Sequence, residues 1–224
     1  MLQVRLGPAE VRFTGRADGD MGHGGEYVTR VTPEVEAKRR AVVDMPWTWL
    51  RQVHAARVVH VRGPGDQSGV PADAAVTLVS GAALAVLTAD CAAIALASRE
   101  GVIGAVHAGW RGLVADVVPR AVDVMRELGA TDVDAVMGPC IHAECYEFGE
   151  DGLDRVAAHL GAGVRGITST GRPALDLPAA VRAALRGAGV RQLDDMNVCT
   201  ACSPDYFSHR ARGEVERQAM VVWR

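Results

Sequence analysis

A nearly continuous apolar stretch over residues 82–107 places the strongest constraint on what this chain can fold into. Its residues are mostly alanine, valine, leucine and isoleucine, and polar residues interrupt it only at 88–90 and 98–101. The interruptions come at intervals of strand length, which favours two or three strands over one long helix. Strands that are apolar along their whole length are buried on both faces. The stretch therefore predicts strands at the centre of the molecule, covered from two sides.

The rest of the chain predicts helices mixed with further strands. Thr32 and Asp176, each followed closely by a proline, are typical of helix starts, and Gly129 is typical of a helix end. The elements do not alternate with the regular spacing of a doubly wound sheet, so we expect an α+β (mixed α/β) fold in a single domain over residues 1–224. Helices are expected over residues 34–43, 114–128 and 153–160 and after 176, and strands over 57–61, 74–78, 133–137 and 219–223.

The charge balance and the apolar pattern exclude several kinds of partner. The formal net charge is −3 and no block of lysine and arginine stands out, so neither nucleic acid nor an anionic membrane surface is expected to bind. No run of about 18 apolar residues occurs, so no membrane-spanning helix is expected. Residues 1–10 lack the basic and apolar regions of a secretion signal, and we therefore expect a cytoplasmic protein.

The chain contains five cysteines, an odd number that does not suit a disulfide framework. In a reducing compartment they are expected to be thiols or metal ligands. Cys199 and Cys202 form a C-x-x-C pair, but a single such pair is weak evidence for a redox or metal site. For this pair, and for Cys140 and Cys145, the sequence favours packed thiols over ligands.

Cys91 differs from the other four cysteines because histidines at the ends of predicted strands accompany it. His54 precedes the strand at 57–61, Cys91 follows the polar residues 88–90, and His107 closes the apolar stretch. Two imidazoles and one thiolate suit zinc in tetrahedral geometry, and three protein ligands leave one position for a water, whose pKa zinc lowers to about 7. The sequence therefore predicts one catalytic zinc ion, with copper as the alternative because blue-copper sites use the same trio.

Residues next to these ligands are candidates for catalysis and for anion binding. Asp90, beside Cys91, is expected to orient a ligand or to move a proton. Gly109 and Gly112 lie at the junction of a strand and a helix, where glycines expose backbone N–H groups, and Arg111 adds a positive charge. This chemistry suits a phosphate held next to a zinc site. The alternative is an ordinary tight turn in which Arg111 makes a surface ion pair.

A series of short motifs follows in order along the chain. They are 52–54 (QVH), 72–74 (ADA), 88–91 (TADC), 107–112 (HAGWRG), 138–141 (GPCI), 145–147 (CYE), 176–177 (DL), 199–202 (CTAC) and 207–210 (FSHR). Together they resemble the YfiH family, the bacterial laccase-domain proteins. The resemblance runs from Phe13 to Trp223, and so many motifs in the same order do not arise by coincidence.

The resemblance implies a zinc enzyme with a layered αββα fold and mixed sheets, whose metal ligands are His54, Cys91 and His107. It also implies phosphorolysis of adenosine, inosine, guanosine and methylthioadenosine, and deamination of adenosine. Gln52 and Asp73 lie in the matched motifs and are expected to orient the ligands or the substrate. An older description of the family is copper-dependent polyphenol oxidase, or laccase. The expected partners are a purine nucleoside and phosphate, and the expected assembly is a monomer or a small homo-oligomer.

Three alternatives stay open on the residues themselves. A copper oxidase would use the same trio, although the seven histidines include no His-X-His pair of the kind found in multicopper sites. A zinc nucleobase deaminase is suggested by residues 142–144 (H-x-E) and the C-x-x-C pair, although no proline precedes Cys199. A non-enzymatic binding module with a structural metal site requires a fourth protein ligand near the other three.

Overall fold

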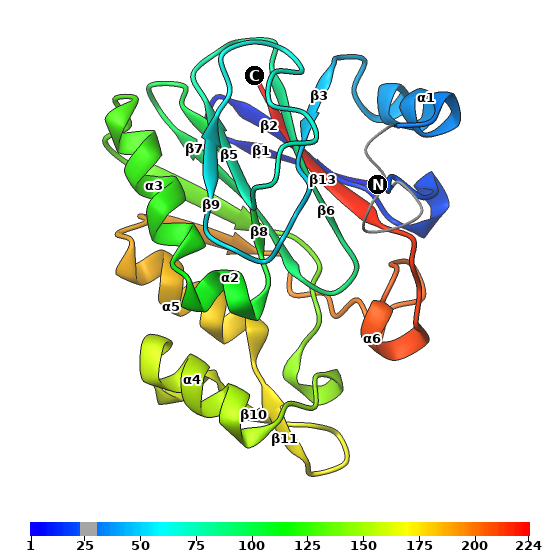
Figure 1. Ribbon diagram of the computed structural model, residues 1–224, viewed down its shortest axis with the longest axis vertical. Helices are drawn as coiled ribbons and strands as arrows, with labels where there is room; N and C mark the ends of the chain where they lie inside the picture. Colours follow the sequence, from blue (N-terminus) through cyan, green and yellow to red (C-terminus); the bar gives the residue numbers. More distant parts are fainter. Residues whose placement is uncertain (23–30) are drawn as a thin grey trace.

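Two β-sheets pack face to face at the centre of the protein, and helices cover the outer face of each sheet (Figure 1). The computed structural model describes residues 1–22 and 31–224. One sheet has five strands and the other has six, and both combine parallel with antiparallel pairing. The arrangement confirms the expected α+β fold with αββα layers and mixed sheets.

The five-stranded sheet brings together segments that are far apart in the sequence. Across the sheet, its strands are β1 (Leu2–Leu6), β2 (Ala9–Phe13), β13 (Gln218–Trp223), β6 (Ala83–Thr88) and β3 (Trp47–Trp49). Strand β13 lies between β2 and β6 and pairs antiparallel with both, whereas β3 pairs parallel with β6. The expected strand at 219–223 is therefore an inner strand of this sheet.

The six-stranded sheet is antiparallel in its middle and parallel at both edges. Across the sheet, its strands are β12 (Gln192–Asp195), β9 (Val133–Met137), β7 (Ala92–Ser98), β8 (Ile103–Ala108), β5 (Ala74–Thr77) and β4 (Val58–His60). The parallel pairs are β12 with β9 and β4 with β5. A separate two-stranded sheet is formed by β10 (Arg165–Ile167) and β11 (Pro173–Leu175).

The apolar stretch over residues 82–107 forms three strands, but they do not lie in one sheet. Strand β6 belongs to the five-stranded sheet, and β7 and β8 belong to the six-stranded sheet. The chain therefore crosses from one sheet to the other at residues 89–91, between the end of β6 and the start of β7. The polar interruption at 88–90 in the sequence marks this crossing.

The core has three layers because the inner strands are buried on both faces. Leu84 of β6 and Ile103 of β8 meet between the two sheets. On the outer face of the six-stranded sheet, Ile94 belongs to the same buried cluster as the helical residues Val118 and Val181. The helices on this face are α2 (Trp110–Val114), α3 (Val117–Glu127), α4 (Glu150–Leu160) and α5 (Leu177–Gly187), and the helix on the opposite face is α1 (Pro33–Val42).

The helices begin where their capping residues predict. The Thr32 hydroxyl accepts a hydrogen bond from the Val35 N–H, and the Asp176 carboxylate accepts one from the Ala179 N–H. The helix expected over 114–128 is interrupted at Asp116, whose φ of +67° separates α2 from α3. Short helical segments are η1 (Arg16–Asp18), η2 (Ala143–Cys145), η3 (Ala162–Val164) and α6 (His209–Arg212).

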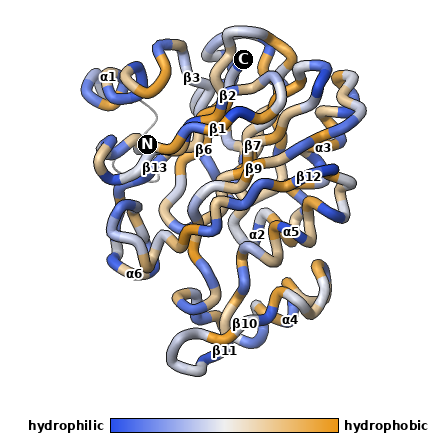
Figure 2. Tube along the Cα trace, turned by 180° about the vertical axis from the view of Figure 1, so that it is seen from behind, coloured by the Kyte–Doolittle hydropathy of each residue, from blue (hydrophilic) through white to orange (hydrophobic). Residues whose placement is uncertain are grey.

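The colouring by hydropathy shows hydrophobic and hydrophilic residues alternating along the helices, as expected for helices that cover one face of a sheet (Figure 2). Edge strand β12, which the sequence did not predict, is largely hydrophilic and only partly buried. The hairpin of β1 and β2 and the short strand β3 were also not predicted. Within the described residues, no helix has the length and apolar character needed to cross a membrane.

Replacing a residue between the sheets tests the layered core. Leu84 is fully buried there, whereas Leu78 is 41% exposed. We expect Leu84→Ala to lower the free energy of unfolding by about 2–5 kcal/mol, because the cavity cannot close between two sheets. Leu78→Ala should change it by less than about 0.5 kcal/mol. Chemical denaturation of both variants measures the difference, and equal effects would contradict this packing.

Candidate metal centre

The three predicted ligand residues come together where the chain crosses between the sheets. Cys91 directly precedes β7, and His107 lies next to the end of the neighbouring strand β8. His54 lies in the loop between β3 and β4 and has a φ of +55°. Each of the three offers one ligand atom, and these atoms lie within 4.8 Å of one another.

The spacing of these atoms suits one ion of the size of zinc. Cys91 Sγ lies 3.7 Å from His54 Nε2, and the imidazole centroids of His54 and His107 are 4.8 Å apart. Bonds of about 2.0–2.3 Å from a tetrahedral ion place its N and S ligands at similar separations. Within the described part of the chain this group consists of three residues, so a tetrahedral ion would keep one position open. A closed structural site, as the non-enzymatic alternative requires, would need a fourth protein ligand in the group.

The carboxylate of Asp73 holds two of the three ligands in place. It is fully buried, and its Oδ1 lies 2.9 Å from His107 Nδ1. The same carboxylate accepts hydrogen bonds from the backbone N–H groups of His54 and Ala55, at 2.9 and 2.8 Å. With Nδ1 of His107 engaged by Asp73, its Nε2 is the atom available to a metal. Asp73 therefore orients ligands, and its burial separates it from any substrate.

The charges at the centre favour a thiolate. Burial raises the pKa of Cys91, but the imidazoles of His107 and His54 outweigh this effect and lower the pKa to about 6. Burial lowers the pKa of His107, but the Cys91 thiolate and the Asp73 carboxylate outweigh it and raise the pKa to about 9. Without a metal, the pair is therefore a thiolate beside an imidazolium. A cation that binds here replaces the proton of His107.

Gly109 lies directly against the ligands and leaves them room. A Cβ atom at this position would lie 2.7 Å from Cδ2 of His54 and 3.1 Å from Sγ of Cys91. Both distances are shorter than van der Waals contact, so a side chain would displace the ligands. The backbone of Gly109 is extended, with φ of −80° and ψ of 161°, so this glycine is required for space and not for backbone conformation.

Two other predicted site residues also support the loops around the centre. The side-chain amide of Gln52 exchanges hydrogen bonds of 2.7 and 2.8 Å with the backbone of Leu87, which fixes the loop of His54 to β6. Gly112 is buried, and a Cβ there would lie 3.2 Å from the carbonyl oxygen of Ala55. Gly112 therefore lets α2 pack closely against the same loop.

Asp90 connects the crossing segment to the C-terminal part of the chain. It has a φ of +100° and is nearly buried. One carboxylate oxygen accepts a hydrogen bond from the Thr200 hydroxyl at 2.7 Å, and the other accepts one from the Arg210 backbone N–H at 2.6 Å. The residue next to Cys91 is thus held by two contacts across the site.

Arg111 is exposed at the start of α2, where its guanidinium lies 4.5 Å from the centre of the Trp110 ring. The first hydrogen bond of this helix runs from the Leu113 N–H to the Gly109 carbonyl. The backbone N–H groups of residues 110–112 therefore have no hydrogen-bond acceptor within the helix.

Two residues near the centre received no role from the sequence. Burial and the nearby charge of Cys91 raise the pKa of Tyr146 to about 12, so its hydroxyl stays protonated at neutral pH. The guanidinium of Arg210 lies 5.0 Å from the centre of the Tyr146 ring. A pocket of about 570 Å³ adjoins them, lined in part by Arg210, Phe148 and Arg172. Tyr146 and Arg210 belong to the motifs CYE and FSHR. Because these motifs are far apart in the sequence, the contact between the two side chains could not be predicted from them.

Residues 142–144 and the C-x-x-C pair, the two parts of the deaminase pattern, also come together, but their potential ligands differ from those of a deaminase. Glu144, Cys199 and Cys202 form a second group of potential ligands together with Cys145. His142 is not part of this group; its Nδ1 lies 3.8 Å from a Glu144 oxygen. Zinc nucleobase deaminases use the histidine as ligand and keep the glutamate free for proton transfer. In the described residues it is Glu144 that lies among the potential ligands, while His142 lies outside the group.

Comparisons with known proteins identify the family and the fold of the chain. The family model described as multi-copper polyphenol oxidoreductase laccase matches residues 23–224. Purine nucleoside phosphorylase SCO2081 of Streptomyces coelicolor is 43% identical over 194 residues, which cover 85% of this chain and 80% of the relative. The crystal structure of protein NMB0706 from Neisseria meningitidis is 30% identical with a TM-score of 0.81, and covers 99% of this chain and 98% of its own.

The crystal structure of the hypothetical protein YfiH from Bacillus licheniformis has the same fold. Its TM-score is 0.83 at 24% identity, and the match covers 96% of this chain and 92% of that one. The resemblance inferred from the motifs is therefore confirmed at the level of fold and of family.

A methyl group at position 109 tests whether the space beside the ligands matters. We expect Gly109→Ala to weaken zinc binding by about tenfold or more, because its Cβ overlaps with His54 and Cys91. Gly149→Ala is the matched control: Gly149 also precedes a helix with an extended backbone, and a Cβ there would meet no atom within 4 Å. Competition with a chelator measures both affinities. Equal zinc binding by the two variants would argue against this centre.

Proposed function

The chain belongs to the multi-copper polyphenol oxidoreductase laccase family, and on this premise we propose that it is a zinc-dependent purine nucleoside phosphorylase. One observation carries the proposal: His54, Cys91 and His107 form a three-ligand group at the sheet crossing, beside a buried carboxylate that orients them. Relatives that carry the name purine nucleoside phosphorylase support the choice of substrate and reaction.

The donor set supports zinc over copper. Two imidazole nitrogens and one thiolate suit zinc, and a bound ion would supply a Lewis acid with an open coordination position. A multicopper oxidase needs further imidazole ligands, and among the described residues this is the one group of potential ligands that contains histidine. The copper-dependent polyphenol oxidase stays the second candidate because the family's description names copper. A blue absorption band after loading with copper would favour it.

Phosphorolysis requires an anion site, and the residues around the centre provide positive charge for it. In this reaction phosphate attacks C1′ of the ribose, the glycosidic bond breaks, and the products are ribose 1-phosphate and the free base. Arg111 and the backbone N–H groups of residues 110–112 at the start of α2 are the proposed phosphate ligands. Gly109 has no side chain that would obstruct a phosphate approaching the metal ligands from these groups.

The base would be held on the other side of the centre. Tyr146 and Phe148 make an edge-to-face contact with ring centroids 5.2 Å apart, beside the pocket that Arg210 lines. A protonated Tyr146 hydroxyl can donate a hydrogen bond to a purine nitrogen that gains negative charge as the bond to ribose breaks. The proposed substrates are adenosine, inosine, guanosine and methylthioadenosine. Deamination of adenosine, in which water replaces the amino group to give inosine and ammonia, is proposed for the same centre.

Incubation of the zinc-loaded protein with adenosine and phosphate tests the proposal directly. We expect ribose 1-phosphate, free base and inosine, and turnover that falls to background in His54→Ala because a metal ligand is lost. His60→Ala, on the neighbouring strand β4 and outside the ligand group, is the control and should keep full activity. Chromatography of the products provides the measurement. If none of the three products forms, the proposed function is wrong.

Arg111→Ala tests the phosphate site separately. Loss of a charged hydrogen bond should raise the KM for phosphate by about tenfold to a hundredfold and leave the KM for nucleoside nearly unchanged. Arg120→Ala removes an equally exposed arginine on α3 and should change neither constant. Initial rates at varied phosphate give both values. An unchanged KM for phosphate in Arg111→Ala would assign phosphate binding to other residues.

A further inference from the structure

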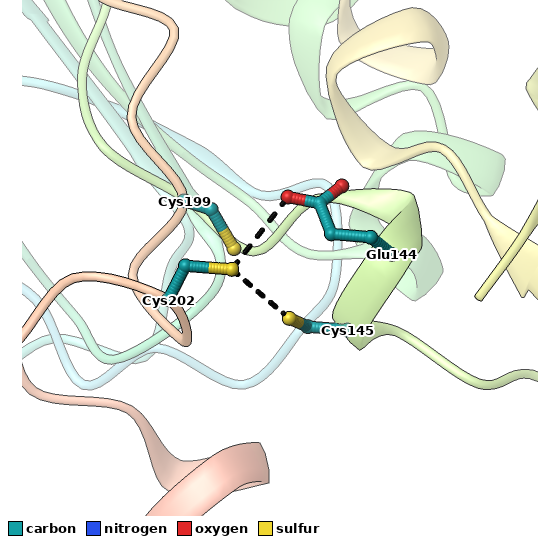
Figure 3. Close-up of side chains that lie close together, drawn as sticks. All are labelled: Glu144, Cys145, Cys199 and Cys202. Carbon is teal, nitrogen blue, oxygen red and sulfur yellow. Dashed lines mark hydrogen bonds between the residues drawn. The ribbon is translucent and has the colours of Figure 1, made fainter. Parts of the chain in front are cut away.

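Four residues outside the centre bring their side chains together at a second place. Glu144 and Cys145 belong to η2, and Cys199 and Cys202 lie on the facing C-terminal segment. One ligand atom from each lies within 4.8 Å of the others. Figure 3 shows the four side chains extending toward one another from the two segments. Cys202 Sγ lies 3.3 Å from Cys145 Sγ and 3.7 Å from a Glu144 oxygen.

We propose that this group is a second metal site, in which one zinc ion is bound by three thiolates and the Glu144 carboxylate. Binding displaces the protons of the three thiols to solvent. Because four protein donors complete a tetrahedral shell, the site is closed and structural. In this it differs from the group of His54, Cys91 and His107, which has three protein donors.

The geometry agrees with a chelating site. Zn–S bonds of about 2.3 Å place sulfur atoms about 3.8 Å apart in a tetrahedral site. The ligand atoms of this group all lie within 4.8 Å of one another, and the sulfurs of Cys145 and Cys202 are 3.3 Å apart. Cys199 and Cys202 have the C-x-x-C spacing that structural zinc sites use. The backbone N–H of His142 points at Cys199 Sγ at 3.4 Å, the kind of hydrogen bond that supports a metal-bound thiolate.

Packing of neutral thiols, which the sequence favoured, does not account for this group. Cys202 and Glu144 are exposed, so burial of apolar surface does not explain why three sulfurs gather around a carboxylate. Cys140 shows the contrast: it is 1% exposed in the hydrophobic core and is not part of the ligand group. Cys140 therefore behaves as a packed thiol, whereas Cys145, Cys199 and Cys202 form a group of potential ligands.

A metal at this position would connect two walls of the proposed active site. Tyr146 follows Cys145 directly, and Thr200 lies between the two cysteines of the C-x-x-C pair. The Thr200 hydroxyl binds Asp90, which precedes Cys91. The ion would therefore hold the segment of Tyr146 and the segment of Thr200 at a fixed separation beside the catalytic centre.

The zinc content of the full-length protein tests the proposal. After loading with Zn²⁺ under reducing conditions and removal of free metal, we expect about two ions per chain in the wild type and about one in Cys202→Ser. Cys140→Ala is the control and should keep both ions. Cys91→Ala/His107→Ala should keep about one ion, at the second site. Cys202 is exposed, so its serine variant should fold, which circular dichroism checks.

X-ray absorption at the zinc edge of Cys91→Ala/His107→Ala gives a second readout that needs no change in the cluster. We expect about three sulfur neighbours at about 2.3 Å from the ion. The proposal is overturned if Cys91→Ala/His107→Ala binds no ion, if Cys202→Ser keeps as many ions as the wild type, or if the ion that remains in Cys91→Ala/His107→Ala has no sulfur neighbours. It is also overturned if peptide mapping of the protein as isolated, without reduction, shows a disulfide between Cys145 and Cys202.

Discussion

The buried carboxylate of Asp73 is the group on which the arrangement of the candidate metal centre depends. An isolated charge in the core is costly, and this one is tolerated because hydrogen-bond donors surround it. Its partners come from two places: the imidazole of His107 on β8 and the backbone of the loop that carries His54. One side chain therefore fixes both the tautomer of one ligand and the left-handed backbone conformation of another. The cost of burying the charge is offset by contacts that also define the site.

The position of the centre follows from the two-sheet architecture. A chain that leaves one sheet and enters another cannot continue its ladder of hydrogen bonds across the gap, so the crossing at residues 89–91 is irregular and has room for polar groups. Cys91 lies at this crossing, and the glycine at 109 keeps the opposite side free of side chains. The carboxylate of Asp90, which faces the C-terminal segment, shows that the gap is closed by residues more than a hundred positions away.

Local sequence signals predicted the parts of the fold that depend on local chemistry. The apolar stretch gave β6, β7 and β8, and the caps at Thr32 and Asp176 marked helix starts correctly. The hairpin of β1 and β2 was missed because both strands are only five residues long and have a polar residue at every second position. At the site, the three candidate metal ligands could be inferred because they flank predicted strands. The contact of Tyr146 with Arg210 and the gathering of three cysteines with Glu144 could not, because tertiary packing brings those segments together.

Strand β13 lies between β2 and β6, and its register pairs Val222 with Val11. The five-stranded sheet consequently stays open in its middle until residues 218–223 have left the ribosome. Before that moment β2 and β6 each present an unpaired edge, and such edges template association with other nascent chains. The many contacts between distant residues also slow folding, because long loops must close first. A newly made chain therefore exposes these two strand edges for longer than a protein whose sheets are assembled from neighbouring strands.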